Sequence, residues 1–454
     1  MRRLIHALAA ALLTVGAFAT PARAAGHAPG TPIAHLIVLM QGGRSFDNYF
    51  GTYPGADGLP PGVCQQVVLG APKNGCVRPH PLHGAVPPQL FVSRSIVTAQ
   101  YDGGRMDGFV AAYHGEGRDG APAMGYYDAR DLPFSWAAAD RYVLFDRFFA
   151  AALHGIRLNR SYWVAAAPPP GDAERVPPGG YGNQPTIFDR LQAAGVSWKV
   201  YVQHYEPAET FRARSAADPD SQTARVPLLN YARFVDDPAL RAHVVDLDQY
   251  YRDLADGTLP AVAYVASSGA SERSARSLPA GQDLTRNLVN QLMVSRSWDS
   301  AALLWTYDGS GGWYDHVPPP RVDGQAQGLR VPALLVSPYV ARGQVNHTIM
   351  GYRSVLRFIE ENWRLDPLTA WDAKANSLAG AFRFTAKPRP AEVIVTGGAR
   401  PAAQLVRVGI VYRWYTAVLV VVLLLLVYSA TRPALRRRLA RAPRHAPRHR
   451  WRTR

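Results

Sequence analysis

Short apolar runs alternate with amphipathic segments between residues 30 and 385. Continuous apolar runs predict strands over residues 34–40, 196–202, 261–266, 301–307 and 331–336. Hydrophobic residues at helical spacing predict helices over residues 186–194, 283–296 and 353–363. Strands that alternate with helices form mostly parallel sheets covered on both faces. We therefore predict an α/β fold with a mostly parallel sheet sandwiched by helices, and long loops over residues 168–182, 206–225 and 267–281.

Both ends of the chain have the pattern of targeting segments. Residues 1–25 start with two arginines, continue through an apolar stretch and end in small residues, which is typical of a secretory signal peptide. Residues 414–431 form an uncharged run, and as a helix of about 27 Å this run would cross the hydrocarbon core of a bilayer. We expect a membrane-anchor region with one C-terminal transmembrane helix over residues 407–431, preceded by a Pro/Gly-containing stalk over residues 387–406.

The formal net charge of +16 is concentrated at the two ends. Residues 432–454 hold ten arginines and no acidic residue, and residues 1–25 hold three more arginines. Without these thirteen, 37 of the 50 basic side chains remain against 34 acidic ones, so the body is nearly neutral and no nucleic-acid partner is expected. The positive-inside rule places the basic tail in the cytoplasm. We expect residues 26–386 to be the extracytoplasmic body of a single-pass cell-membrane protein.

Cys64 and Cys76 are the two cysteines of the chain. Export to an oxidising compartment favours a disulfide between them, and closing so short a loop stabilises a fold by about 3 kcal/mol in the chain-entropy model. A zinc site is the weaker alternative, because two thiolates without further ligands at a suitable spacing do not complete a ligand set.

Polar residues follow two of the expected strands. Arg44 and Asp47 come after the strand at 34–40, and Asp308, Asp315 and His316 come after the strand at 301–307. Ligand sites of open parallel sheets lie beyond the carboxyl ends of the strands, so these side chains would cluster if the two strands are neighbours. Such a cluster could hold a metal or an anionic substrate. Equally, Asp47 could cap a helix or turn, and Asp308 could form an internal ion pair with Arg44.

Five ordered segments carry a recognisable set of motifs. They read HLIVLMQGGRSFDNYFG (35–51), TIFDRL with GVSWKVY (186–191, 195–201), YD with GGWYDHVPPP (307–308, 311–320), RVPALLVSPY (330–339) and SVLRFIEEN (354–362). In these segments the chain closely resembles the bacterial phosphoesterase family, which contains non-haemolytic phospholipases C and related acid phosphatases. The resemblance implies an alkaline-phosphatase-like fold for residues 26–386. It also implies phosphate-ester hydrolysis by a hydroxyl nucleophile and a divalent metal held at the strand ends.

Several site positions differ from the family motifs. Gly42 and Gly43 stand where the family has Glu-Asn, and Gly309 stands where it has Glu. The nucleophile segment, Gly-Pro-Thr/Ser-x-Pro-Asn-Arg, aligns with residues 154–160 and places Ile156 at the nucleophile. The family's Glu-His-Pro aligns with residues 272–274, which read Glu-Arg-Ser, and its Asp-His aligns with Gly-Tyr at 351–352. Isoleucine cannot attack phosphorus, and glycine offers no side-chain ligand, so we predict that the reaction centre is dismantled.

The motif positions that keep polar residues are expected to line a residual pocket. They are Arg44, Asp47, Asn159, Arg160, Asp308 and His316. In that pocket the backbone N–H groups of Gly42 and Gly43, together with Arg44, could hold an anion without a metal. Asp308 is the one candidate metal ligand. The alternative is that these residues survive only as supports of the fold, with Arg44 and Asp308 paired.

The chain is therefore predicted to be a membrane-anchored, phospholipase C-like pseudoenzyme. It would act as a binding or envelope-associated module, without a cofactor, for a phosphate-bearing or lipid ligand; the sequence identifies no protein partner. The alternative is an active metal-dependent phosphoesterase with a rearranged site. A relocated site would draw on Ser45, Ser161, Ser310 or His154.

Overall fold

The computed structural model describes residues 26–84, 87, 89–171, 175–213, 221–322, 324–396 and 419. The signal predicted over residues 1–25, the basic tail and the predicted membrane span, apart from residue 419, lie outside this set. Within the described residues, no helix has both the length and the apolar composition needed to cross a bilayer. The elements below belong to one compact unit, residues 1–83 and 87–401.

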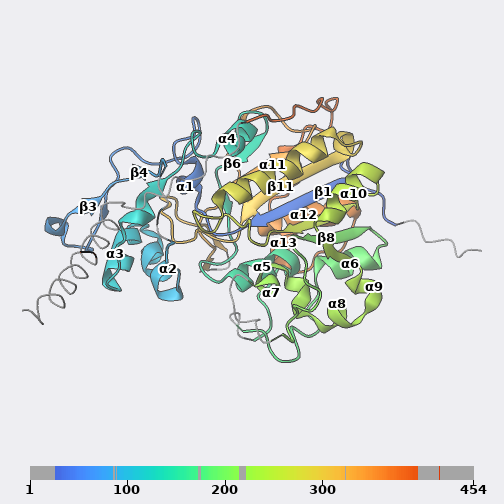
Figure 1. Ribbon diagram of the computed structural model, residues 1–454, viewed down its shortest axis with the longest axis horizontal. Coiled ribbons are helices and arrows are strands. Elements are labelled where there is room, and N and C mark those ends of the chain that lie inside the picture. Colours follow the sequence, from blue (N-terminus) through green and yellow to red (C-terminus); the bar gives the residue numbers. More distant parts are fainter. Residues whose placement is uncertain are drawn as a thin grey trace, which may run out of the picture. The chain divides into compact units, whose positions relative to one another are not determined.

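An eight-stranded sheet forms the centre of this unit (Figure 1). Across the sheet the strands are β15 (Gln344–Asn346), β6 (Val143–Phe145), β14 (Ala333–Val336), β11 (Ala301–Tyr307), β1 (His35–Gln41), β10 (Val262–Ala266), β8 (Trp198–Val202) and β9 (Val244–Asp246). Strand β14 is antiparallel to both of its neighbours, and the other pairings in this sheet are parallel. The prediction of a mostly parallel sheet is confirmed.

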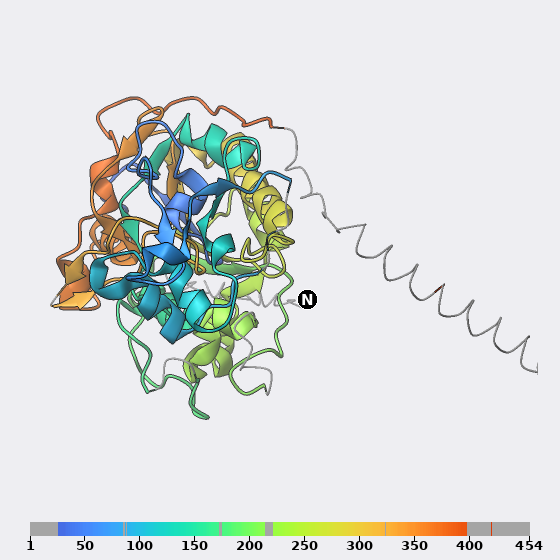
Figure 2. The same ribbon diagram turned by 90° about the vertical axis from the view of Figure 1, so that its left-hand side faces the viewer.

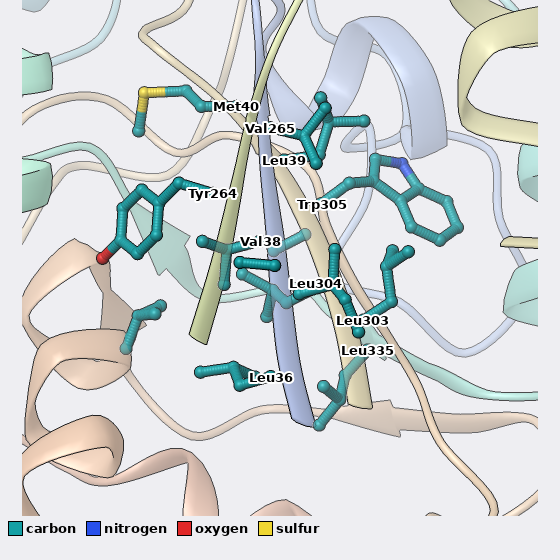
Figure 3. Packing of buried hydrophobic residues seen from close by; sticks show 14 of the residues in the cluster. Leu36, Val38, Leu39, Met40, Tyr264, Val265, Leu303, Leu304, Trp305 and Leu335 are labelled. Carbon is teal, nitrogen blue, oxygen red and sulfur yellow. The ribbon is translucent and has the colours of Figure 1, made fainter. Parts of the chain in front are cut away.

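The central strands are apolar throughout because helices cover both faces of the sheet. Figure 3 shows Met40 and Tyr264 on one side of the sheet and Trp305 on the other. The Tyr264 hydroxyl donates to the backbone oxygen of Trp163 in α5 (Ile156–Ala165). On the opposite face, Trp305 stacks on Phe134 of α4 (Pro133–Ala139). Side chains on both faces of the sheet are thus buried, which explains the unbroken apolar runs of the central strands.

The face of the sheet that carries Tyr264 is covered by α5, α6 (Ile187–Ala193) and α12 (Tyr352–Trp363). The opposite face is covered by α4, α10 (Asp248–Asp256) and α11 (Leu278–Val294). The predicted helices at 186–194, 283–296 and 353–363 correspond to α6, α11 and α12. Helix α11 begins five residues earlier than expected. Its second residue is Pro279, and proline is tolerated in the first helical turn, where its missing N–H would have no partner.

A lobe of short elements lies beyond the carboxyl ends of the central strands and faces the viewer in Figure 2. It contains β2 (Gln65–Gln66), β3 (Cys76–Val77), β4 (His80–Pro81), β5 (Gly125–Tyr126), α2 (Arg94–Tyr101) and α3 (Phe109–Gly115). A disulfide joins Cys64 to Cys76 beside the β2–β3 pair, as predicted. Phe109 packs edge-on against Tyr314, so the lobe contacts the loop that follows β11.

The first residues of the predicted stalk lie against the body. The Trp298 indole N–H donates to the backbone oxygen of Arg389, and Asn290 exchanges two hydrogen bonds with the backbone of Ile394. Ile394 itself is buried. The chain is therefore attached to the body as far as residue 394, eight residues beyond the predicted end of the domain.

Candidate functional site

The loops after β1 and β11 lie side by side, as the sequence predicted. These strands pair in parallel and end in register at Gln41 and Tyr307. The backbone N–H of Asp308 donates to the Gln41 oxygen at 3.0 Å, and the N–H of Gly43 donates to Asp308 Oδ1 at 2.9 Å. The loops that follow β1 and β11 therefore meet at the carboxyl edge of the sheet.

Asp308 is a buried carboxylate held by two arginines. Arg160, from α5, donates from Nε and Nη2 to Oδ2 at 3.2 and 3.1 Å. Arg273, from the loop between β10 and α11, donates from Nη2 to Oδ1 and Oδ2 at 3.2 and 3.0 Å. Burial alone would raise the pKa of Asp308, but the positive charges of Arg273 and Arg160 lower the pKa below its ordinary value. Asp308 is therefore ionised, and both of its oxygens accept hydrogen bonds.

Arg44 does not pair with Asp308, contrary to the alternative considered from the sequence. Its Nε and Nη2 donate to the backbone oxygen of Glu272 at 2.9 and 2.7 Å. The guanidinium lies 5.0 Å from the ring centre of Trp313 and 5.6 Å from that of Tyr49. Arg44 is fully buried and supports the loop that carries Arg273. Asp308 is paired instead with Arg160 of α5, which also donates to the Met40 oxygen near the end of β1.

The Glu272 carboxylate, also buried, fixes the same loop. Its Oε2 accepts the hydroxyl groups of Tyr49 and Tyr307, both at 2.8 Å, and its Oε1 accepts the Gln282 amide at 3.1 Å. Burial raises the pKa of Glu272. Glu272 has a φ of +58°, a conformation that side chains rarely adopt, and this turn directs the next residue, Arg273, toward Asp308.

Asp47 and His316 belong to a second cluster. His316 Nδ1 lies 2.7 Å from Asp47 Oδ2, and its Nε2 lies 3.2 Å from Asp57 Oδ1. The guanidinium of Arg330 donates to Asp47 at 2.9 Å and to Asp315 at 3.0 Å. Asp47, Asp315 and His316 present ligand atoms within 4.8 Å of one another, but Arg330 already supplies the positive charge between the two carboxylates. Burial raises the pKa of Asp315 to about 7, against the lowering effect of Arg330.

Asn159 and the candidate serines have structural partners. Asn159 Oδ1 accepts the N–H groups of Ala151 and Ala152 at 3.0 and 2.8 Å and so shapes the loop before α5. Ser45, rather than Asp47, is the N-cap of α1 (Phe46–Phe50), and its hydroxyl donates to the Tyr314 oxygen. Ser161 and Ser310 make hydrogen bonds to the backbone of Ala167 and Gly312.

A cavity of about 560 Å³ lies between the lobe and the start of α5. The described residues in its wall are Gln89, Leu90, Phe91, Val92, Ser93, Arg94, His154, Gly155, Ile156, Arg157, Arg273, Gly311 and Trp313. None of the six residues expected to line a residual pocket is among them: five are buried, and the partly exposed His316 lies beside Asp47 and Asp57 instead. Of the candidates for a relocated site, only His154 reaches this wall. The residues at 89–94 belong to no motif, so the sequence carried no signal for their role.

A divalent metal does not fit the residues around Asp308. Both carboxylate oxygens already accept guanidinium N–H groups, and Oδ1 also accepts the Gly43 N–H. A Cβ at position 42 would lie 3.0 Å from the Cβ of Arg273 and 2.9 Å from the Ser271 oxygen. No space is left there for a ligating side chain. The expectation that Asp308 could ligate a metal is therefore not supported by its surroundings.

Comparison with known proteins gives consistent matches. The model of the phosphoesterase family matches residues 33–366. The chain is 30% identical to phospholipase C B of Mycobacterium tuberculosis, covering 86% of this chain and 87% of that protein. It is 28% identical to the non-hemolytic phospholipase C of Pseudomonas aeruginosa, covering 78% of this chain and 57% of that protein. A solved structure of an alkaline phosphatase superfamily protein from Vibrio parahaemolyticus matches with 10% identity and a TM-score of 0.36, over 76% of this chain and 70% of that chain.

Proposed function

The chain belongs to the phosphoesterase family, and from that premise we propose that its body is a pseudoenzyme that binds a phosphate-bearing ligand without hydrolysing it. We also propose that a C-terminal span tethers this body to the outer side of the cell membrane. The first proposal rests on the cavity beside α5. The second rests on the apolar run at 414–431 and the arginine-rich tail that follows it.

Ile156 in the cavity wall is the observation that carries the proposal. It is the first residue of α5 and lies in the cavity wall. The motif resemblance through Asn159 and Arg160 leads us to expect the family's hydroxyl nucleophile at this position. An alkyl side chain cannot form a phosphoryl-enzyme bond. Among the described wall residues only Ser93 carries a hydroxyl, and that oxygen caps α2 by accepting the N–H of Ile96.

The chemistry of the same wall supports an anionic ligand. Arg94, Arg157 and Arg273 line it together with His154, and no wall residue that the structure describes has a carboxylate. Guanidinium groups make strong, charge-assisted hydrogen bonds to phosphate oxygens. The apolar side chains of Phe91 and Trp313 would contact the organic part of a phosphate ester. A lipid headgroup and a soluble phosphomonoester share this chemistry.

Turnover and binding assays on the full chain, purified in detergent, test the proposal. We expect no hydrolysis of a phosphodiester or a phosphomonoester, with or without added divalent metal. Calorimetry with glycerol phosphate and with micelles containing phosphatidylglycerol would show which source of phosphate binds. Substitutions Arg94→Gln and Arg157→Gln should each weaken binding by about tenfold or more, since the loss of one charged contact of about 1.4 kcal/mol has that effect.

The matched control is Arg212→Gln, which removes an exposed arginine paired with Asp236 and should leave binding unchanged. Chelator-sensitive turnover that persists through repeated purification would instead support the active, rearranged phosphoesterase. A folded parent that binds neither probe would overturn the binding proposal.

A further inference from the structure

The positively charged side chain of Arg273 reaches the carboxylate of Asp308, which the family resemblance made a candidate metal ligand. The side chain leaves the loop between β10 and α11, and Nη2 contacts both oxygens of Asp308 at 3.2 and 3.0 Å. The side chain of Arg273 is 16% exposed and that of Asp308 is 2% exposed. The ion pair is therefore largely shielded from water and is more than a surface contact.

Gly42 makes this position of Arg273 possible. The Gly42 N–H donates to the Ser271 oxygen at 2.6 Å, which brings the two loops into close contact. A Cβ built at position 42 would lie 3.0 Å from the Cβ and 3.4 Å from the Nε of Arg273. The same Cβ would lie 2.9 Å from the Ser271 backbone oxygen, so a side chain at position 42 would force the segment that carries Arg273 to shift. Gly42 has no positive φ, so backbone conformation does not explain the glycine.

The charges at Asp308 lead to the same conclusion. A buried carboxylate requires a positive partner, and here Arg160 and Arg273 both supply one. A divalent cation placed beside Asp308 would be repelled by two guanidinium groups. It would also have to displace hydrogen bonds that already occupy both oxygens.

We propose that the guanidinium of Arg273 is a built-in cation that replaces a divalent metal at Asp308, and that its contact with Asp308 requires glycine at position 42. This chain would then need no metal to fold or to keep its site intact. The inference concerns Asp308 and its partners, so it holds whether or not the neighbouring cavity binds phosphate.

A double-substitution cycle on the full chain in detergent tests the coupling. Gly42→Glu alone should lower the thermal midpoint, because the new side chain collides with the Ser271 oxygen and with Arg273 and so moves Arg273 away from Asp308. Arg273→Ala alone should also lower it, because Asp308 loses one of its two cations. In the Gly42→Glu background, however, Arg273→Ala should lower the midpoint much less than it does in the parent, because the displaced Arg273 no longer contacts Asp308. This non-additive effect is the expected result.

Gly115→Glu is the matched control for the cycle. Gly115 lies at the end of α3 with open space around its position, so its effect should simply add to that of Arg273→Ala. If Gly42→Glu does not fold, the cycle is repeated with Gly42→Ala, which adds only the Cβ that meets the Ser271 oxygen and the Arg273 Cβ. If the effects of Gly42→Glu and Arg273→Ala simply add, as those of Gly115→Glu and Arg273→Ala should, the coupling is refuted.

Mn²⁺ tests the replacement of the metal. The midpoint of the parent should be the same in EDTA and in Mn²⁺, and the purified parent should hold no stoichiometric divalent metal. The Gly42→Glu/Arg273→Ala variant combines two carboxylates without the second guanidinium, and Mn²⁺ should raise its midpoint by about 2–4 °C. A parent that is destabilised by EDTA, or a double variant that does not respond to Mn²⁺, would count against the built-in cation. Neither readout depends on phosphate binding.

Discussion

Arg160 donates two hydrogen bonds to one oxygen of Asp308, at 3.2 and 3.1 Å, and thereby joins α5 to the end of β11. Arg160 also donates to the backbone oxygens of Met40 and Arg225, at 3.0 Å each. One buried side chain thus holds together the ends of β1 and β11 and the start of α5. This is why a family arginine can persist beside Ile156: its contacts with the framework do not depend on a nucleophile.

Removing the negative charge of Asp308 should destabilise the protein strongly. Asp308→Asn removes the negative charge and leaves Arg160 and Arg273 buried side by side without a counter-charge. Breaking a buried pair in this way costs about 3–5 kcal/mol in the free energy of unfolding. Chemical denaturation of the detergent-solubilised chain measures the loss. A loss below about 1 kcal/mol would mean that water reaches this pair and screens it.

Acidification should reveal how much the ionised Asp308 contributes to stability. The folded-state pKa of Asp308 lies below its unfolded value of 3.8, so its contribution to stability is present above pH 3.8 and is lost as the pH falls through the lower, folded pKa. The parent should therefore lose more stability than Asp308→Asn on acidification below about pH 4. Parallel acid unfolding curves for the two proteins would contradict this.

Restoring the hydroxyl alone should not restore catalysis. Ile156→Thr places a hydroxyl at the start of α5, but Asp308 remains bound by two arginines, which on our proposal take the place of an activating metal. We expect turnover of phosphate esters to stay at the background level of the parent. Adding Gly42→Glu, Gly43→Asn and Gly309→Glu should destabilise the chain as well, since Gly43 and Gly309 have φ values of +25° and +150°. Metal-dependent turnover by Ile156→Thr alone would refute this prediction.

The sequence predicted the central strands well because each is buried on both faces and reads as one apolar run, as in β1 and β11. It also placed the loops at 42–47 and 308–316 together. The partner of Asp308 could not be predicted, because the sequence does not show that Arg160 lies closer to it than Arg44 does. The cavity was missed for a related reason: its wall combines the lobe with the start of α5, and strands of two residues in that lobe have no detectable periodicity.

The predicted topology can be tested on cells. If the chain is a single-pass protein with its body outside, protease added to spheroplasts should cleave the body, while an epitope placed after residue 454 stays protected until the membrane is opened. The mature N-terminus should begin near residue 26 after removal of the signal. Protection of the body in spheroplasts whose known surface proteins are cleaved would overturn this arrangement.

Glu360 should make the protein less stable as the pH rises through the neutral range. Its carboxyl is buried on α12, and burial together with a hydrogen bond to Asp372 raises its pKa to about 9 from 4.5. The folded state therefore holds a proton that the unfolded state releases. Stability is fully present below about pH 4.5 and declines as the pH rises toward 9.

Glu360→Gln should remove this decline. The glutamine can accept the Leu368 N–H as Glu360 does at 3.1 Å, and its amide can donate to Asp372 without ionising. At pH 8 the variant should be more stable than the parent by about 1–3 kcal/mol, and at pH 5 the two should be nearly equal. Denaturant unfolding at both pH values measures the difference, and Glu361→Gln, at the exposed neighbouring position, is the control. An equal gain at pH 5 and pH 8 would show that packing, rather than the bound proton, accounts for the effect.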